Sequence, residues 1–135
     1  MQQPCPCGGL SYGSCCSPLH RGLLQAITAE QLMRSRYAAY ALGEVDYLLA
    51  THPSREPLGR RRRALQASLT QVRWRRLEIL EATAGGPEDT TGTVTFAAHY
   101  TAADQIGVMR EVSRFGREGQ RPDGRWLYLE ALELS

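Results

Sequence analysis

TTGTVTFAAHYTAADQIGVMREVSRF, residues 90–115, contains two runs that are rich in β-branched and aromatic residues. The first run extends from Thr90 to Thr101 and the second from Ile106 to Phe115, with Ala-Ala-Asp-Gln between them. Runs of this kind bounded by turn residues are typical of β-strands. Because so short a connection favours antiparallel neighbours, we expect the two runs to pair with each other.

Two further runs of the same kind flank this pair. Val72 to Ala82 precedes Gly-Gly-Pro-Glu-Asp, and Arg125 to Leu134 follows Arg-Pro-Asp-Gly. The sequence therefore predicts a four-stranded antiparallel meander. Within the last run, Trp126-Leu127-Tyr128-Leu129 is apolar on both sides, which fits a curved sheet with helices inside the curve.

The residues before the sheet have a helical pattern. Thr28-Ala-Glu-Gln31 has the form of a capping box. Apolar side chains recur behind it near helical spacing, namely Leu32, Tyr37, Tyr40, Ala41 and Tyr47 or Leu48. We predict helices at about 28–42, 44–50 and 58–69, and His52-Pro53 ends the second because proline restricts the residue before it. Helices followed by a sheet are an α+β pattern, and 135 residues suffice for one domain with a core.

All four cysteines lie in the first sixteen residues, as Cys5-Pro-Cys7 and Cys15-Cys16. Thiolates bind zinc tetrahedrally at about 2.3 Å, so four of them would have to converge from two short arms. Glycines between the arms permit the tight reversal that this needs. Disulfides are the alternative. Adjacent or nearly adjacent cysteines meet disulfide geometry poorly within each pair, whereas cross-pairing between the arms stays open.

The expected cellular compartment and the energetics of ordering the N-terminal segment both favour zinc over disulfides. The chain has no signal-peptide pattern and no apolar run near about 18 residues, so we expect a cytoplasmic protein without membrane insertion. In a reducing compartment, clustered cysteines are typical of metal sites. The first 22 residues hold too few large apolar side chains to offset ordering costs of about 1–2 kcal/mol per residue. Structural zinc contributes on the order of 10 kcal/mol. His20 is a fifth candidate ligand, ranked after the four thiolates.

Three blocks of the chain resemble known families. Cys-Pro-Cys-Gly, followed by Tyr-x-x-Cys-Cys, resembles the SEC-C motif, a zinc knuckle of the SecA translocation ATPase and of small bacterial proteins. Leu32 to Ser54 and Arg110 to Ala131 resemble two signatures of the YchJ-like proteins.

The resemblance implies a nuclear transport factor 2 (NTF2)-like domain, a cystatin-like cone of helices against a curved antiparallel sheet. Residues 1–22 would form the knuckle and residues 23–135 the NTF2-like domain. It also implies that Tyr12 is a packing residue and that the zinc ligands are Cys5, Cys7, Cys15 and Cys16. The resemblance does not imply any known enzymatic reaction.

By the same resemblance, the inner surface of the cone would receive side chains from the first helix and the sheet. The candidates with chemical reach are Arg34, Arg36, Tyr37, Tyr40, His52, His99, Glu111 and Arg114. A His52–Glu111 pair would suit a base and its orienting group. The structural interpretation is an ion pair of Glu111 with Arg36 or Arg114, with the tyrosines in the core. Because the known phosphate-loop, zinc-protease and serine-hydrolase motifs are absent, an enzyme is suggested by fold analogy alone and no catalytic residue is assigned.

Arginines gather between the helices and the first strand. All 16 basic residues are arginine, and the net charge is only +2. Eight of them are Arg55, Arg60, Arg61, Arg62, Arg63, Arg73, Arg75 and Arg76. Because arginine binds phosphate bidentately, Arg60 to Arg63 are candidates for contact with RNA or the ribosome. A solvated helix face is the simpler interpretation, since the avoidance of lysine is uniform.

The function that the sequence favours is a zinc-stabilised binding or adaptor module with an unidentified protein partner. Four thiolates would close the coordination shell, which makes the metal structural. One alternative is an enzyme or small-ligand-binding protein that uses the cavity of the cone. Another is an RNA- or ribosome-associated protein that binds through the arginine cluster. Domains of this kind often pair through the exposed sheet face, so a homodimer through that face is a further expectation.

Overall fold

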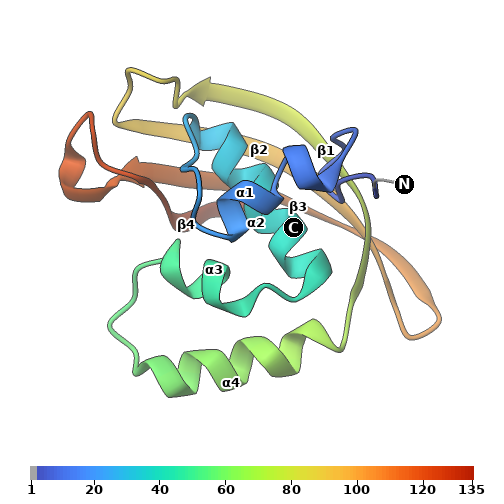
Figure 1. Cartoon of the computed structure of the whole chain (residues 1–135). Coiled ribbons are helices and arrows are strands. Elements are labelled where there is room, and N and C mark those ends of the chain that lie inside the picture. The colour runs from blue at the N-terminus through green and yellow to red at the C-terminus, as the bar shows by residue number, and fades with distance from the viewer. Residues whose placement is uncertain (1–2) are drawn as a thin grey trace.

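The computed structural model describes residues 3–135 and shows helices packed on one face of a four-stranded antiparallel sheet (Figure 1). The strands are β1 (Arg73–Ala84), β2 (Thr91–Ala102), β3 (Gln105–Arg117) and β4 (Trp126–Leu134). They pair in the order β1-β2-β3-β4, which confirms the predicted meander. Each strand begins and ends within about two residues of its predicted bounds, because the turn residues limit the strands locally.

The helices are α1 (Ser17–His20), α2 (Ala29–Leu42), α3 (Val45–Ala50) and α4 (Leu58–Leu69). Two single 3-10 turns occur at Tyr12–Ser14 and Glu118–Gln120. The three predicted helices are confirmed as α2, α3 and α4. The sequence predicts neither α1 nor the 3-10 turns, because one turn is too short to show an apolar period.

Local hydrogen bonds define the start of α2. The Thr28 hydroxyl accepts from the Gln31 amide at 3.0 Å, and the Gln31 side chain accepts from the Ile27 amide at 2.7 Å. The predicted capping box therefore forms, although the Gln31 side chain bonds the amide before the cap instead of the cap's own. The Ala29 amide donates to the Gly85 carbonyl in the β1–β2 turn at 2.9 Å, so the sheet also holds this end of the helix.

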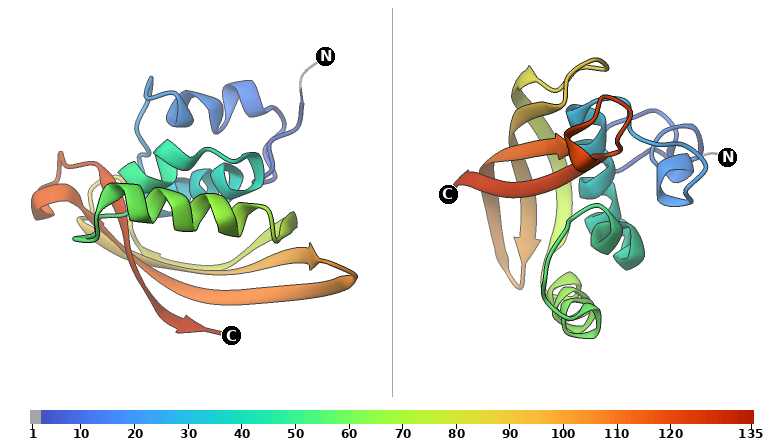
Figure 2. Two further views of the ribbon diagram at one scale, coloured as in Figure 1. Left: turned by 90° about the horizontal axis from the view of Figure 1, so that it is seen from below. Right: turned by 90° about the vertical axis from the view of Figure 1, so that its left-hand side faces the viewer.

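The main core lies between α2 and the concave face of the sheet. Its buried residues are Ala29, Leu32, Met33, Tyr37, Val94, Phe96, Ala98, Phe115 and Trp126. Trp126 is 1% exposed, and its indole nitrogen donates to the Ile27 carbonyl at 3.0 Å, which ties β4 to the start of α2. Register shifts in β1 and β4 mark irregularities of the kind that bend strands. Figure 2 shows the curved sheet, with all four helices on its concave side.

The N-terminal segment packs on α2 and on the β1 side of the sheet. A second buried cluster consists of Cys5, Cys7, Cys16 and Ala38, and Leu77 of β1 packs against both clusters. The knuckle is thus continuous with the main core, while the division into residues 1–22 and 23–135 stays a prediction. Within residues 3–135, no helix has the length and apolarity needed to cross a membrane.

Candidate metal centre and cone cavity

The sulfur atoms of the four cysteines converge on one point. All four lie within 4.8 Å of one another. The Cys7 sulfur is 3.5 Å from that of Cys15 and 3.7 Å from that of Cys16, and the last two are 3.9 Å apart. A tetrahedron whose corners lie about 2.3 Å from its centre has edges of about 3.8 Å. The spacing therefore fits one four-coordinate metal ion. The cysteines are free, so neither arrangement of disulfides is present.

Tight turns bring the two cysteine arms together. The Cys5 amide donates to the Gly9 carbonyl at 3.0 Å, and the Gly8 amide donates to the Cys5 carbonyl at 3.0 Å. Gly8 has a φ of 107°, which a residue with a side chain rarely adopts. A Cβ on Gly9 would lie only 2.7 Å from the Cys15 sulfur. The glycines thus let the backbone of the first arm approach the second.

The thiols differ in acidity. A hydrogen bond from Cys16 lowers the pKa of Cys7 to about 5, whereas burial raises the pKa of Cys15 to about 12. The bond to Cys7, together with burial, also raises the pKa of Cys16. One thiolate therefore opposes ionisation of its neighbours. A divalent cation among the sulfurs would offset that repulsion and favour all four thiolates.

His20 lies beside the cluster but uses both ring nitrogens elsewhere. Its Nε2 is 2.7 Å from the Ser35 carbonyl oxygen of α2, and its Nδ1 is 2.7 Å from the Tyr12 hydroxyl. Because a carbonyl only accepts, Nε2 carries the proton and Nδ1 accepts from Tyr12. His20 therefore fastens the knuckle to α2. The prediction of His20 as a fifth ligand is wrong.

Arg34 makes a second contact between α2 and the knuckle. Its Nη1 donates to the Cys7 carbonyl at 2.8 Å, and its Nε pairs with Glu30 at 2.9 Å. Two positions along a helix correspond to a rotation of about 200°, so Arg34 and Arg36 face opposite sides of α2. The prediction that Arg34 lines the cone is therefore wrong.

A cavity of about 240 Å³ lies between α2 and the sheet. It is lined by Met33, Arg36, Tyr37, Tyr40, Trp74, Phe96, Ala98, Met109, Glu111, Ser113, Phe115 and Tyr128. Four of the predicted residues are in this lining: Arg36, Tyr37, Tyr40 and Glu111. The other eight lining residues were not among the candidates from the sequence. Alternation along β3 nevertheless places Met109, Ser113 and Phe115 on the same face as Glu111.

Arg36 is buried at the wall of the cavity and is only 7% exposed. Its Nη1 donates to the Leu48 carbonyl at 3.0 Å and to the Thr51 hydroxyl at 2.6 Å. Its guanidinium carbon lies 4.8 Å from the centre of the Tyr128 ring. Burial lowers the pKa of Arg36. The carbonyl, the hydroxyl and the aromatic face all stabilise the cation there.

Glu111 makes neither of the contacts predicted for it. Its Oε2 accepts from the Ser113 hydroxyl at 2.5 Å and from the Tyr128 hydroxyl at 2.9 Å. Arg114 pairs with Glu130 instead, because residues three apart on a strand point to opposite faces. Arg36 and Glu111 act on each other through space but form no direct ion pair within residues 3–135.

Both candidate histidines lie outside the cavity lining. His52 follows α3 and packs edge-on against Tyr128, with 4.8 Å between the ring centres. Among residues 3–135, no ion pair joins His52 to Glu111, so the candidate base and orienting pair does not form. His99 of β2 bonds Glu78 at 2.6 Å on the face of the sheet away from the lining.

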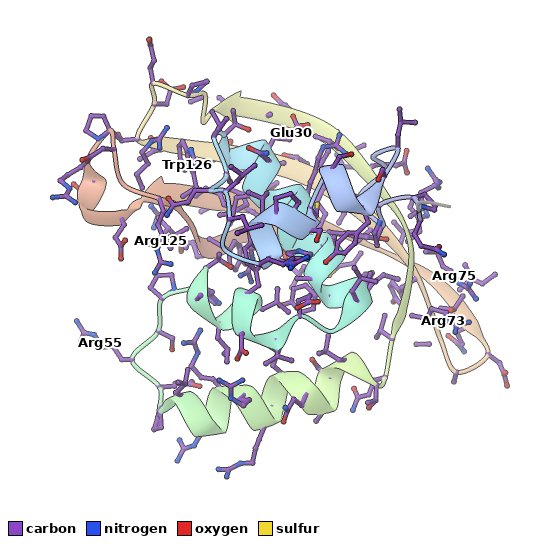
Figure 3. The ribbon with its side chains drawn as sticks, viewed as in Figure 1. Glu30, Arg55, Arg73, Arg75, Arg125 and Trp126 are labelled. Carbon is purple, nitrogen blue, oxygen red and sulfur yellow. The ribbon has the colours of Figure 1, made fainter. Side chains whose placement is uncertain are left out.

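The arginine cluster is divided between internal contacts and solvent. Arg61 donates to the His52 carbonyl at 2.5 Å, and Arg62 pairs with Asp46 at 2.5 Å. Arg60 and Arg63 are exposed. In Figure 3, Arg55 points outward near the start of α4, and Arg73 and Arg75 lie near its other end. The contact with RNA or the ribosome stays a prediction.

Comparisons with known proteins agree with this arrangement. Residues 28–131 match the family model described as YchJ, middle NTF2-like domain. A UPF0225 protein of Corynebacterium efficiens is 48% identical over 130 residues, covering 92% of this chain and 88% of the relative. A UPF0225 protein of Streptomyces coelicolor is 45% identical over 129 residues, covering 94% and 93% respectively.

Two solved structures resemble the whole chain. The solution structure of a SEC-C motif containing protein from Rhodopseudomonas palustris has a TM-score of 0.79 and 31% identity, covering 98% of this chain and 100% of that one. The crystal structure of a SEC-C motif containing protein from Psychrobacter arcticus has a TM-score of 0.77 and 27% identity, covering 95% and 81%. The chain therefore belongs to the YchJ-like UPF0225 family, with a central domain of the NTF2-like fold.

Proposed function

We propose that this protein is a small-ligand-binding module whose N-terminal segment is held by a structural zinc ion. The observation that carries the zinc assignment is the convergence of four cysteine sulfurs within 4.8 Å, three of them 3.5 to 3.9 Å apart. Cys5, Cys7, Cys15 and Cys16 would fill all four positions of the ion. No position is then left for a reacting water, so the metal stabilises the fold and does no chemistry.

Metal analysis of the full chain tests the zinc assignment. Protein purified without chelator should contain about one zinc per chain. A variant with both Cys7→Ser and Cys16→Ser should lose it, because two of the four ligands are gone. Ser14→Ala is the matched control, since Ser14 lies in the same segment, is exposed and should retain zinc. A zinc-free preparation in which residues 5–20 keep the order that they have in the zinc-loaded protein would contradict the assignment.

The cavity supports the binding part of the proposal. Its walls are largely aromatic, and the buried charge of Arg36 lies among them. Two of its ionisable groups, Arg36 and Tyr37, do not suit proton transfer near neutral pH. Burial raises the pKa of Tyr37 to about 12, and an arginine stays protonated. Polar groups placed at an apolar cavity are typical of a ligand site.

Titration calorimetry with small aromatic probes tests the cavity. We expect at least one of L-phenylalanine, 3-phenylpropionate, 2-phenylethylamine and benzyl alcohol to bind one molecule per chain. Ala98→Leu should weaken that binding at least about tenfold, because Ala98 lines the cavity and leucine would occupy part of it. Ala97→Leu adds the same atoms one residue away, outside the lining, and is the control. Absence of binding by all four probes would contradict this function.

A further inference from the structure

We propose that the cavity recognises a small zwitterion with a flat apolar body, of the aromatic α-amino acid type. Its carboxylate would bind Arg36 and its ammonium group Glu111. This inference rests on the proposed function of the cavity as a ligand site and adds the chemical class of the ligand.

One edge of the Arg36 guanidinium has no protein partner. Only Nη1 donates hydrogen bonds within residues 3–135. Nε and Nη2 have no hydrogen-bond partner among the described residues. Neither of these two atoms is fully enclosed by protein. Both therefore reach open space, and the space that Arg36 lines is the cavity. Nε and Nη2 together form the parallel pair of donors that binds a carboxylate through both oxygens.

Glu111 offers the complementary group on the same cavity. Both of its hydrogen bonds, from Ser113 and Tyr128, go to Oε2. Oε1 has no partner among the described residues, so it can accept from a ligand. The Ser113 and Tyr128 hydroxyls fix the carboxylate on β3 and lower the cost of ordering it when a ligand binds.

The apolar wall defines the body of the ligand. Tyr37 and Trp74 lie with ring centres 6.0 Å apart, and Phe96, Met109 and Met33 also line the cavity. Aromatic rings and methionine pack well against a flat apolar group. The volume of about 240 Å³ is below the roughly 300–1,000 Å³ of sites for drug-sized molecules, so the ligand must be small.

Charge balance selects a zwitterion over a simple ion. Arg36 and Glu111 bring opposite charges to one cavity without a direct ion pair. A ligand with only a carboxylate would satisfy Arg36 and be repelled by Glu111, and an amine would do the reverse. A ligand with both groups pairs the buried charge of Arg36 and the half-buried charge of Glu111 each with its opposite.

Calorimetry with matched analogues tests the ligand class on the full, zinc-loaded chain. L-Phenylalanine should bind at least about tenfold more tightly than 3-phenylpropionate, which lacks the ammonium group, or 2-phenylethylamine, which lacks the carboxylate. Glu111→Gln should remove the preference over 3-phenylpropionate, because glutamine keeps an oxygen for Tyr128 but loses the charge. Glu133→Gln changes an exposed carboxylate on β4 and should leave the preference intact.

The outcomes separate this inference from the proposed function. If either truncated analogue or benzyl alcohol binds as tightly as L-phenylalanine, and Ala98→Leu abolishes that binding, the cavity is a ligand site but the zwitterion class is wrong. If no probe binds, both the zwitterion class and the role of the cavity as a ligand site are wrong. If Glu111→Gln leaves the preference for L-phenylalanine unchanged, the assigned role of Glu111 is overturned.

Discussion

Gly9 sets how closely the two cysteine arms approach each other. A Cβ at this position would lie 2.7 Å from the Cys15 sulfur and 3.5 Å from the Cys5 Cβ. Gly9→Ala should therefore displace Cys15 and lower the stability of the zinc-loaded protein by about 1–3 kcal/mol. Zinc release to a competing chelator measures the effect. Gly13→Ala is the control, because its nearest neighbour would be at 3.8 Å. Equal zinc retention by both variants would contradict the expected crowding.

His52 makes stability depend on pH. Burial lowers its pKa below the ordinary value of 6.5, and the charges of Arg36 and Arg61 lower it further. The folded state therefore binds a proton at His52 less readily than the unfolded state does. Above about pH 6.5, protonation of His52 does not affect the free energy of unfolding. Below that value the unfolded state takes up the proton more readily, so the free energy of unfolding falls as the pH drops.

Urea unfolding at several pH values checks this dependence. Between pH 7.5 and pH 5.5, the wild-type protein should lose more unfolding free energy than His52→Gln, which cannot take up the proton. The loss of the ring contact with Tyr128 affects the variant equally at all pH values, so only the slope is compared. Parallel pH profiles would show that His52 does not titrate as described.

At the scale of the element, α2 joins the two candidate sites. Arg34 bonds the backbone of Cys7 on one side of the helix, and Arg36 lines the cavity on the other. Met33 and Tyr37 follow the same cavity side at helical spacing. The position of α2 therefore determines the geometry of both the knuckle and the cone.

The cap of α2 is a measurable part of that support. Thr28→Ala removes the hydroxyl that accepts from Gln31 and should lower the free energy of unfolding by about 1 kcal/mol. Thr70→Ala is the control. Thr70 follows α4, and its hydroxyl donates only to the exposed Ala67 carbonyl, so this substitution should change the free energy of unfolding by less than about 0.5 kcal/mol. Denaturant unfolding gives both values. A Thr28→Ala variant as stable as Thr70→Ala would argue against the cap.

The elements could be predicted because their signals are local. The capping box, the helical spacing behind it and the turns between strands gave bounds close to those of α2 and the sheet. The side of a helix or strand on which each residue lies was predicted less well. Arg114 was grouped with Glu111 although three positions on a strand put them on opposite sides, and Arg34 was grouped with Arg36 against the helical period. Tyr128 was missed because its strand is apolar on both sides, and only the three-dimensional packing shows which side lines the cavity.

At the scale of the whole molecule, the knuckle packs against a core that has its own apolar contacts. The main cluster around Phe96, Phe115 and Trp126 contains none of the cysteines. Metal removal by chelator under reducing conditions should therefore expose the amides of residues 5–20 to hydrogen exchange. The amides of β2 and β3 should stay protected, because the two strands pair with each other and the main cluster that covers them contains no cysteine.

Hydrogen exchange with and without chelator measures this difference. The Gly9→Ala variant provides an independent weakening of the same segment. Loss of protection throughout the chain would show that the knuckle and the NTF2-like domain unfold as one unit, against the predicted division at residue 22.

X-ray absorption at the zinc edge is the sharpest test of the four-thiolate centre, because it identifies the atoms bound to the ion in the intact protein. The four converging cysteines predict about four sulfur neighbours at about 2.3 Å. Zinc surrounded mainly by nitrogen or oxygen at about 2.0–2.2 Å would contradict the four-thiolate centre.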